Sequence, residues 1–211
     1  MIIGLTGKNG SGKGEVVNVL KSLNFQYQSL SDVLRDELTA SGKPVTREAL
    51  IQLGNDLRKK HGPAVLAEKI LKRLEPDKNY VVDSIRNPNE AKVFKKHKEF
   101  TLVSIASRPE LRFERLRTRG RESDPKTLED FTVLEKREAA GDTYAQNLDS
   151  TISMSDLILE NNGSLDELKA KVLEVIHYYF KLEIFAAYAL VVLVNVPVHC
   201  AELQYLFVSC S

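Results

Sequence analysis

A glycine-rich segment between a short apolar run and a helical stretch constrains this chain more than any other feature. Residues 7–14, GKNGSGKG, follow the apolar residues 2–5 and precede a helix expected from Glu15. The spacing G-x-x-x-x-G-K allows the backbone to form a nest whose N–H groups point at phosphate oxygens, and the helix N-terminus adds about half a positive charge. The segment therefore predicts a phosphate-binding loop, a P-loop, formed by Gly7, Asn9, Gly10, Ser11, Gly12, Lys13 and Gly14.

One position of this loop departs from the usual pattern. The Ser or Thr that commonly follows the lysine, and whose hydroxyl binds Mg²⁺, is Gly14 here, and Glu15 comes next. The Glu15 carboxylate either favours the helix N-terminus electrostatically or binds a metal ion through water, and the sequence does not decide between these roles. Lys13 has the position from which a lysine reaches the β and γ phosphates.

Short apolar runs alternate with segments of helical periodicity over residues 1–180. The runs MIIGL, YVVD, FTLVSIA and DLILE are brief and rich in β-branched residues, which is typical of strands buried on both faces. Helical segments between them follow N-cap residues such as Ser31 and Asn87. This alternation predicts an α/β fold with a parallel sheet and right-handed crossovers.

Composition narrows the classes of partner. The chain has 30 Lys and Arg against 29 Asp and Glu, so it has no general electrostatic attraction for nucleic acid. The four histidines and two cysteines show no metal-ligand spacing, and the N-terminus does not resemble a signal peptide. We expect a cytoplasmic protein that binds neither nucleic acid nor membrane, and its oligomeric state stays open.

From about Lys181 the amino-acid composition of the sequence changes. Residues 184–194 are eleven consecutive apolar residues, which is shorter than the about 20 that a membrane span needs. Three interpretations stay open: an extra strand or helix docked on the domain, an oligomer contact, or a C-terminus that is not native. We expect one domain over residues 1–180 and a tail of unknown role over residues 181–211.

Two further segments carry residues suited to an acceptor. Asp83 ends the run YVVD, at the edge where α/β sheets bind ligands, and a carboxylate there can hold Mg²⁺ through water or accept a proton from an attacking hydroxyl. Arg86 follows, and Arg35 stands near Asp32 at the start of a helix. Guanidinium groups bind phosphate through paired hydrogen bonds, although an exposed Asp32–Arg35 pair is the alternative for that helix.

Arginines recur at helical spacing after residue 107, at Arg108, Arg112, Arg115 and Arg119. The segment of about 119–142 is polar and contains Gly and Pro breaks, which is typical of a mobile lid that closes over a triphosphate. Arg119, Arg121 and Arg137 are candidates for stabilising the transferred phosphoryl group, and Arg115 for contacting the nucleotide. Pairing of Glu110 and Glu114 with nearby arginines on an exposed helix is the alternative for about half of them.

The segments IIGLTGKNGSGKGE, SDVLRDEL, VVDSIRNPNEAKVF and RFERLRTRGRESDPKTLEDF give the chain its family resemblance. It resembles P-loop nucleotide kinases related to dephospho-coenzyme A kinase and adenylate kinase, and most closely a mostly archaeal branch. The resemblance implies a three-layer P-loop NTPase fold, in which helices cover both faces of a five-stranded parallel sheet and a helical lid closes the site. It also implies ATP and Mg²⁺ as co-substrates.

The resemblance implies phosphoryl transfer to a small-molecule acceptor, such as a nucleoside monophosphate or dephospho-coenzyme A. A different class of function stays open beside it. A regulatory module would bind a nucleotide without turning over an acceptor, and would be a remnant of a fusion of such a kinase with a deaminase. The missing hydroxyl at Gly14 and the apolar tail are the features that favour this alternative.

Overall fold

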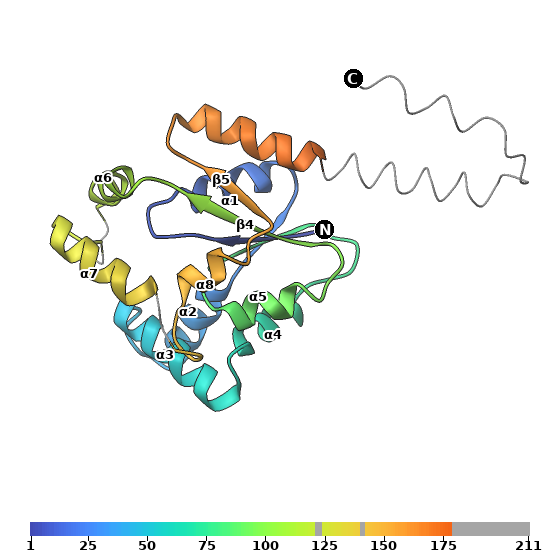
Figure 1. Ribbon diagram of the computed structural model, residues 1–211. Helices are drawn as coiled ribbons and strands as arrows, with labels where there is room; N and C mark the ends of the chain where they lie inside the picture. Colours follow the sequence, from blue (N-terminus) through green and yellow to red (C-terminus); the bar gives the residue numbers. More distant parts are fainter. Residues whose placement is uncertain (121–123, 140–141, 179–211) are drawn as a thin grey trace, which may run out of the picture. The chain divides into compact units, whose positions relative to one another are not determined.

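The computed structural model describes residues 1–120, 124–139 and 142–178. In this part of the chain, strands alternate with helices as the sequence predicts (Figure 1). The elements are β1 (Ile2–Thr6), α1 (Lys13–Ser22), β2 (Gln26–Ser29), α2 (Leu30–Ala40), α3 (Arg47–His61), α4 (Val65–Leu71), β3 (Tyr80–Asp83), α5 (Pro88–Phe94), β4 (Phe100–Ala106), α6 (Pro109–Arg119), α7 (Leu128–Ala139), α8 (Leu148–Ile152) and β5 (Leu157–Glu160). Residues 165–178 form a further helix.

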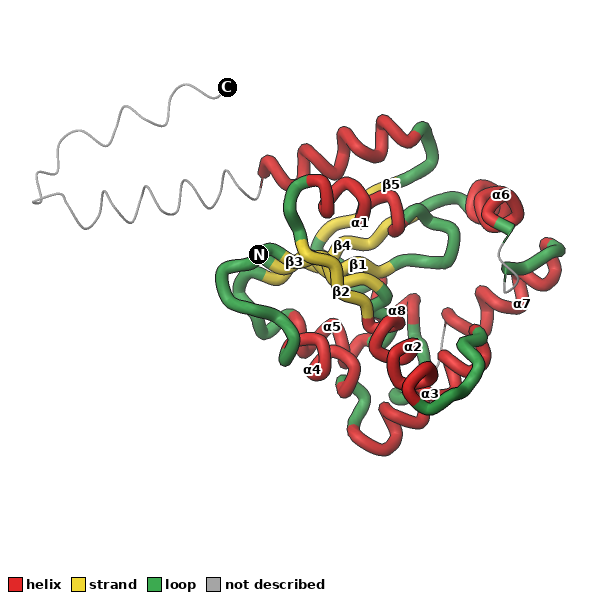
Figure 2. The backbone as a smooth tube through the Cα atoms, turned by 180° about the vertical axis from the view of Figure 1, so that it is seen from behind, coloured by secondary structure: helices red, strands yellow, loops and turns green. Residues whose placement is uncertain are grey.

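The strands make one parallel sheet of five strands in the order β2-β3-β1-β4-β5. β1 lies at its centre, with Gly4 opposite Val82 of β3 and Leu102 of β4. α1 and the helical residues 165–172 lie on one face, and α4, α5 and α8 lie on the other (Figures 1 and 2). The predicted α/β fold, with a five-stranded parallel sheet between helical layers, is confirmed.

The main hydrophobic core lies between the sheet and helices α2, α4 and α5. Leu66, Ile70 and Phe94 are fully buried, and the Phe94 ring stacks on Phe100 with their centroids 5.2 Å apart. Burial of side chains of this size stabilises a fold by about 1.5–3 kcal/mol each. This core holds the carboxyl ends of β1 and β3 side by side, and the candidate functional site lies at that edge.

Two details of the predicted elements are wrong. The run LILE is expected to be buried on both faces, but β5 is an edge strand and its Ile158 is 61% exposed. The sequence of a short apolar run does not show whether the strand lies at the edge or at the centre of a sheet. The helix expected after Ser31 begins earlier, because Ser29 has the extended backbone of an N-cap and its Oγ accepts a hydrogen bond from Ser31 N.

The described chain up to Val172 makes one compact unit, and a second unit begins at Leu173. The sheet and helices α1–α8 belong to the first unit. The boundary predicted near residue 180 lies outside the described residues and stays a prediction. Within the described ranges, none of the helices is both long enough and apolar enough to cross a membrane.

Candidate functional site

The loop between β1 and α1 has a backbone that only glycine adopts readily. Gly7, Gly10 and Gly12 have φ angles of 130°, 77° and 104°. A Cβ atom at any of these three positions would lie within 2.6 Å of another atom of the chain. Gly12 is also the N-cap of α1, so the loop leads directly into a helix N-terminus, where unpaired N–H groups favour an anion. The backbone thus has the shape that a phosphate cradle requires.

Gly14 lies in the first turn of α1 and differs from the other glycines of the loop. A Cβ atom at Gly14 would meet nothing within 4 Å, and its φ angle is an ordinary one. The backbone therefore does not require glycine at this position. A side chain with a hydroxyl group would fit at the place where the sequence lacks it.

Lys13 begins α1 and turns back over the loop. Its Nζ donates hydrogen bonds to the carbonyl oxygens of Gly7 and Lys8, at 2.7 and 3.1 Å. Burial lowers the pKa of Lys13 to about 8, and the negative charge of Asp83 opposes this change. The ammonium group is thus poorly solvated and held inside the loop, where a polyphosphate would compensate its charge.

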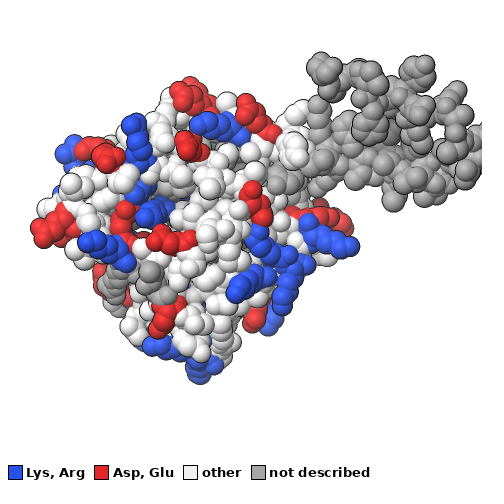
Figure 3. Space-filling view, viewed as in Figure 1, with Lys and Arg blue, Asp and Glu red and all other residues white. Residues whose placement is uncertain are grey.

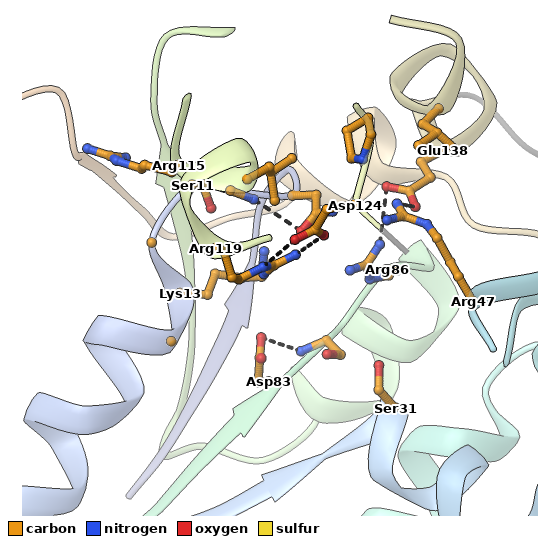
Figure 4. Close-up of a pocket in the computed structure, with 18 of the residues that line it drawn as sticks. Ser11, Lys13, Ser31, Arg47, Asp83, Arg86, Arg115, Arg119, Asp124 and Glu138 are labelled. Carbon is orange, nitrogen blue, oxygen red and sulfur yellow. Dashed lines mark hydrogen bonds and ion pairs between the residues drawn. The ribbon is translucent and has the colours of Figure 1, made fainter. Parts of the chain in front are cut away.

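Asp83 ends β3, at the same edge of the sheet as the glycine-rich loop (Figure 4). Its Oδ1 accepts a hydrogen bond of 2.6 Å from the backbone N of Ser84. Ser84 has a φ angle of 67°, which is rare for a residue with a side chain, and such strain often marks a functional site. The turn fixes the carboxylate at the carboxyl edge of the sheet, close enough to Lys13 to shift the pKa of the lysine.

Arg86 lies three residues beyond Asp83, and several elements hold it. Its Nη1 donates to Oε1 of Gln146 at 3.2 Å, and its backbone N donates to Oε2 of Glu90, also at 3.2 Å. Glu90 is fully buried and its Oε1 accepts two hydrogen bonds from Arg58, at 2.9 and 2.8 Å. Burying this ion pair fixes the start of α5, and so the position of the Arg86 backbone.

Glu138 of α7 joins two arginines that come from different parts of the chain (Figure 4). One carboxylate oxygen is bonded to Nη2 of Arg47, the first residue of α3, and the other lies 3.3 Å from Nη1 of Arg86. Burial raises the pKa of Glu138, but the charges of Arg86 and Arg47 outweigh burial and the pKa is lowered overall. The carboxylate is therefore ionised at neutral pH.

The arginines of α6 lie in three different environments. Arg119 makes a two-point contact with the carboxylate of Asp124, which is buried. Arg115 donates to Oγ of Ser107 and to the carbonyl oxygen of Asn161, both at 3.1 Å. Nδ2 of Asn161 donates in turn to the carbonyl oxygen of Ser11 at 2.8 Å, so Arg115 is connected to the glycine-rich loop through the residue that follows β5.

Arg112 has the third environment: it is buried and connects the predicted lid to the glycine-rich loop. Its guanidinium forms a two-point ion pair with Glu135 of α7 and lies 5.2 Å from the centroid of the Phe131 ring. Its Nε donates to the carbonyl oxygen of Ser107, and its Nη1 lies 3.5 Å from that of Asn9. Arg112 therefore has a structural role. The helical spacing of the arginines did not distinguish it from the others.

The remaining predicted residues have mixed outcomes. Arg35 lines the cavity described below, and its Nη1 is 2.6 Å from Oδ1 of Asp32 in an exposed pair. Glu15 is exposed and accepts a hydrogen bond of 3.4 Å from Asn18. Arg121 lies outside the described residues, and the side chain of Arg137 does too, although its backbone belongs to α7.

Two loop side chains fit their predicted place without showing a direct role. Oδ1 of Asn9 accepts a hydrogen bond of 3.1 Å from the backbone N of Gly10. Ser11 Oγ is buried and, within the described part of the chain, has no hydrogen-bond partner. A buried hydroxyl without a partner costs free energy, and here it lies in the turn expected to receive phosphate oxygens.

The sequence interpretation missed Arg47, Asp124 and Glu138. Arg47 carries one available signal, because it is the first residue of α3 and a cation at a helix N-terminus is electrostatically unfavourable. Such a residue calls for a nearby anion, and Glu138 supplies it. Glu138 carries no local signal, because only the tertiary fold brings it to Arg86. Asp124 stands five residues after Arg119, so the nearby opposite charge was a signal that the interpretation did not use.

Many of these groups line one large cavity of about 2020 Å³ between the glycine-rich loop, α2, α3, α6 and α7. Figure 3 shows a hollow on this face, with basic atoms inside it and acidic atoms around it, where Figure 1 places the loop after β1. Pockets for a single small ligand commonly measure about 300–1,000 Å³. The cavity has room for two ligands. The residues that line it include Gly10, Gly12, Lys13, Arg35, Arg47, Asp83, Arg86, Arg115, Arg119 and Glu138.

Comparison with known proteins places the chain in a family. A UPF0200 protein of Pyrococcus abyssi is 35% identical over 179 residues, which cover 82% of this chain and 93% of the relative. The chain belongs to the UPF0200 family. A UPF0200 protein of Pyrococcus furiosus is 34% identical over 85% of this chain and 98% of its own length. A family model described as an AAA domain matches residues 3–140. The predicted relationship to an archaeal branch is confirmed by the UPF0200 relatives.

Solved structures share this fold at low sequence identity. TT1252 from Thermus thermophilus has a TM-score of 0.55 and 22% identity, over 84% of this chain and 97% of its own. A gluconokinase from Sinorhizobium meliloti has a TM-score of 0.52 and 15% identity, over 87% and 95%. A shikimate kinase from Acinetobacter baumannii, in complex with shikimate, has a TM-score of 0.52 and 14% identity, over 84% and 93%. These similarities concern the fold.

The donor set around Asp83 fits a hydrated divalent cation. Carboxylate and hydroxyl oxygens are hard ligands, and the hydroxyls of Ser29 and Ser84 lie 3.4 Å apart beside the Asp83 turn. Within the residues that the structure describes, no three His, Cys, Asp or Glu side chains form a metal cage. The glycine-rich loop and Lys13 fit a polyphosphate, because they present backbone N–H groups and one desolvated cation.

Proposed function

We propose that this protein transfers the γ-phosphoryl group of ATP to a small nucleotide-like acceptor, such as a nucleoside monophosphate or dephospho-coenzyme A. The observation that carries the proposal is the single cavity that joins the glycine-rich loop, Asp83 and the Arg47–Arg86 pair. A kinase needs a donor cradle and an acceptor site that open toward each other. The size of the cavity and the family's kinase-like P-loop domain support this arrangement.

The donor end consists of the loop and the first turn of α1. Backbone N–H groups from Gly7 to Gly14 bind the phosphates, and Lys13 exchanges its two carbonyl partners for phosphate oxygens. Arg115 contacts the nucleotide beside Asn161. Glu15, exposed at the start of α1, lies near enough to the cavity to affect the metal or the helix terminus.

Asp83 acts where the two substrates meet. The acceptor oxygen attacks the γ phosphorus, the bond from that phosphorus to the bridging oxygen breaks, and ADP leaves. Asp83 accepts the proton when the acceptor is a hydroxyl group. Asp83 would hold a Mg²⁺ ion through water, and the ion would supply positive charge to the phosphates. The protein contributes mainly position and electrostatics, as is usual in phosphoryl transfer.

The acceptor end consists of Arg86 with Arg35 and Asp32 beside it. Arg86 is held at its backbone by Glu90 and faces the cavity, so it binds an anionic group of the acceptor without large rearrangement. Arg35 is exposed and paired with Asp32, so it joins only when an acceptor arrives. Arg119, Arg121 and Arg137 of the lid offset the charge that develops during transfer.

The test is ADP production by the full chain with ATP, Mg²⁺ and a panel of phosphate-bearing acceptors. We expect steady ADP release that depends on one acceptor, and at least about a hundredfold loss of it in Lys13→Ala. Stoichiometric ATP binding with no turnover of any acceptor would assign the protein to the regulatory class instead. Absence of Lys13-dependent ATP binding would contradict both functions.

A further inference from the structure

The carboxylate of Glu138 is bound by two arginines and has little contact with solvent. Its side chain is 8% exposed, and those of Arg47 and Arg86 are 16% and 20% exposed. Figure 4 shows both guanidinium groups beside the carboxylate, with Arg47 reaching it from α3 and Arg86 from the segment after β3. Two guanidinium groups that converge on one carboxylate form the arrangement that also recognises phosphate, so this is an anion site filled by the protein itself.

The arginines do not depend on Glu138 alone for their positions. Arg86 keeps its bonds to Gln146 and, through its backbone, to Glu90. Arg47 belongs to α3, which is capped by Thr46 through a hydrogen bond from Ala49 N. The anion site therefore persists when the carboxylate leaves, and the first residue of α3 then needs another anion to offset the helix dipole.

We infer that Glu138 occupies the acceptor's anion site in the free protein and selects the acceptor by charge, so that a phosphate monoester displaces it and a monocarboxylate does not. The inference rests on the proposed function and specifies its acceptor. The carboxylate of Glu138 is tethered to the site. A free carboxylate would make the same ion pairs as Glu138 and would also lose the entropy of association. A phosphate dianion brings three oxygens and almost two charges, which match two guanidinium groups better.

The site has one positive charge in excess while Glu138 is present and two when it is displaced. Asp83 lies on the other side of Arg86, toward Lys13, and balances the donor end. A molecule of the right shape but with a smaller negative charge therefore does not displace Glu138. The expected substrate is a small phosphate monoester whose phosphate lies between α3 and the end of β3.

The test measures the affinity of the full chain for inorganic phosphate and for acetate by calorimetry, without nucleotide. Glu138→Gln keeps the shape of the side chain but removes its charge. We expect this variant to bind phosphate about tenfold more tightly, because the site is no longer self-occupied, and to bind acetate measurably. Glu129→Gln is the matched control: it removes the same charge from the same helix, at an exposed position that also lines the cavity, so it tests whether loss of any negative charge there raises the affinity. Its affinity for phosphate is expected to change less than about twofold.

The glycine-rich loop also binds phosphate, so a second arginine variant separates the two sites. Adding Arg47→Ala to Glu138→Gln is expected to abolish the gain in affinity. Glu138→Ala, with its folding checked by thermal unfolding, should show the same gain as Glu138→Gln. Unchanged or weaker phosphate binding in both Glu138 variants would overturn the inference and make Glu138 a clamp for the arginines, and so would an equal gain in Glu129→Gln.

Failure of this inference differs from failure of the proposed function. If the Glu138 variants leave phosphate affinity unchanged while ATP binding and acceptor-dependent ADP release persist, only the assignment of Glu138 is lost. If ATP binding does not depend on Lys13, the kinase function is lost whatever Glu138 does. The two measurements use different ligands and different variants, so neither result hides the other.

Discussion

At the scale of single residues, Lys13 has the most informative chemistry. Burial lowers its pKa to about 8, so a part of the free protein has a neutral lysine in mildly alkaline solution. Phosphate oxygens restore the charge, and ATP binding should then take up a proton. The pH dependence of the affinity for ATP therefore reports the environment of this one side chain.

We expect the Kd for ATP to rise as pH increases through about 8, by up to about tenfold per pH unit, until the pKa of the complex is reached. Calorimetry between pH 7.5 and 9.5, in buffers of different ionisation enthalpy, measures both the affinity and the proton uptake. Lys13→Arg is the control, because arginine stays charged over this range. A flat profile in the unmodified protein would contradict the assigned environment of Lys13.

Gly12 and Gly14 offer a matched pair within the same loop. Gly12→Ala forces a Cβ atom to 2.2 Å from Nδ2 of Asn161, at a φ angle of 104°, so it should lower the free energy of unfolding by about 1–3 kcal/mol and abolish ATP binding. Gly14→Ala has free space and should stay within about 1 kcal/mol of the unmodified protein. Urea unfolding measures both. Equal damage from the two substitutions would mean that the loop is not built as described.

At the scale of elements, two contacts fasten the later part of the lid segment. Arg112 of α6 binds Glu135 of α7, and Nδ2 of Asn87 donates to the carbonyl oxygens of Thr143 and Ala145, at 2.9 and 2.8 Å. The second contact ties the end of the lid to the residue next to Arg86. Any rearrangement of α7 is therefore transmitted to the acceptor arginine and, through Arg112, to the phosphate loop.

Two arginines of α6 should behave very differently on truncation. Arg112→Ala leaves Glu135 with a poorly compensated charge and should lower the free energy of unfolding by about 3–5 kcal/mol. Arg117→Ala removes a pair with Glu114 in which both side chains are more than half exposed, and should cost less than about 1 kcal/mol. Urea unfolding gives the energies, and hydrogen exchange shows whether α7 loosens in the first variant. Similar costs for both would remove the structural role assigned to Arg112.

Much of the element order could be predicted from the sequence, because buried parallel strands and capped helices leave local patterns. The glycine-rich loop could also be predicted from the sequence, because its spacing reflects a backbone requirement that Gly7, Gly10 and Gly12 each meet. The pairing of Arg86 with Glu138 was not, because it joins segments more than 50 residues apart and depends on how α7 packs. Local periodicity also failed to separate Arg112, which is buried, from the exposed arginines beside it.

At the scale of the whole molecule, the predicted division of the chain near residue 180 is open to a direct test. The sheet, the main core and the residues that line the cavity lie within residues 1–172, and Leu168 and Val172 of the helix that begins at residue 165 are buried there. We therefore expect a chain that ends at residue 180 to unfold cooperatively, with the midpoint of the full chain, and to bind ATP with the same affinity.

A chain that ends at residue 163 supplies the comparison. It loses Leu168, whose Cδ2 would lie 3.7 Å from a Cβ atom at Gly12, and so it loses packing directly behind the phosphate loop. Removal of a fully buried leucine alone costs about 2–5 kcal/mol, so this shorter chain should unfold at a lower temperature and bind ATP poorly. Differential scanning calorimetry and ATP titration compare the three chains. A large loss of stability on removing only residues 181–211 would show that this segment is part of the folded domain, and the boundary near residue 180 would then be wrong.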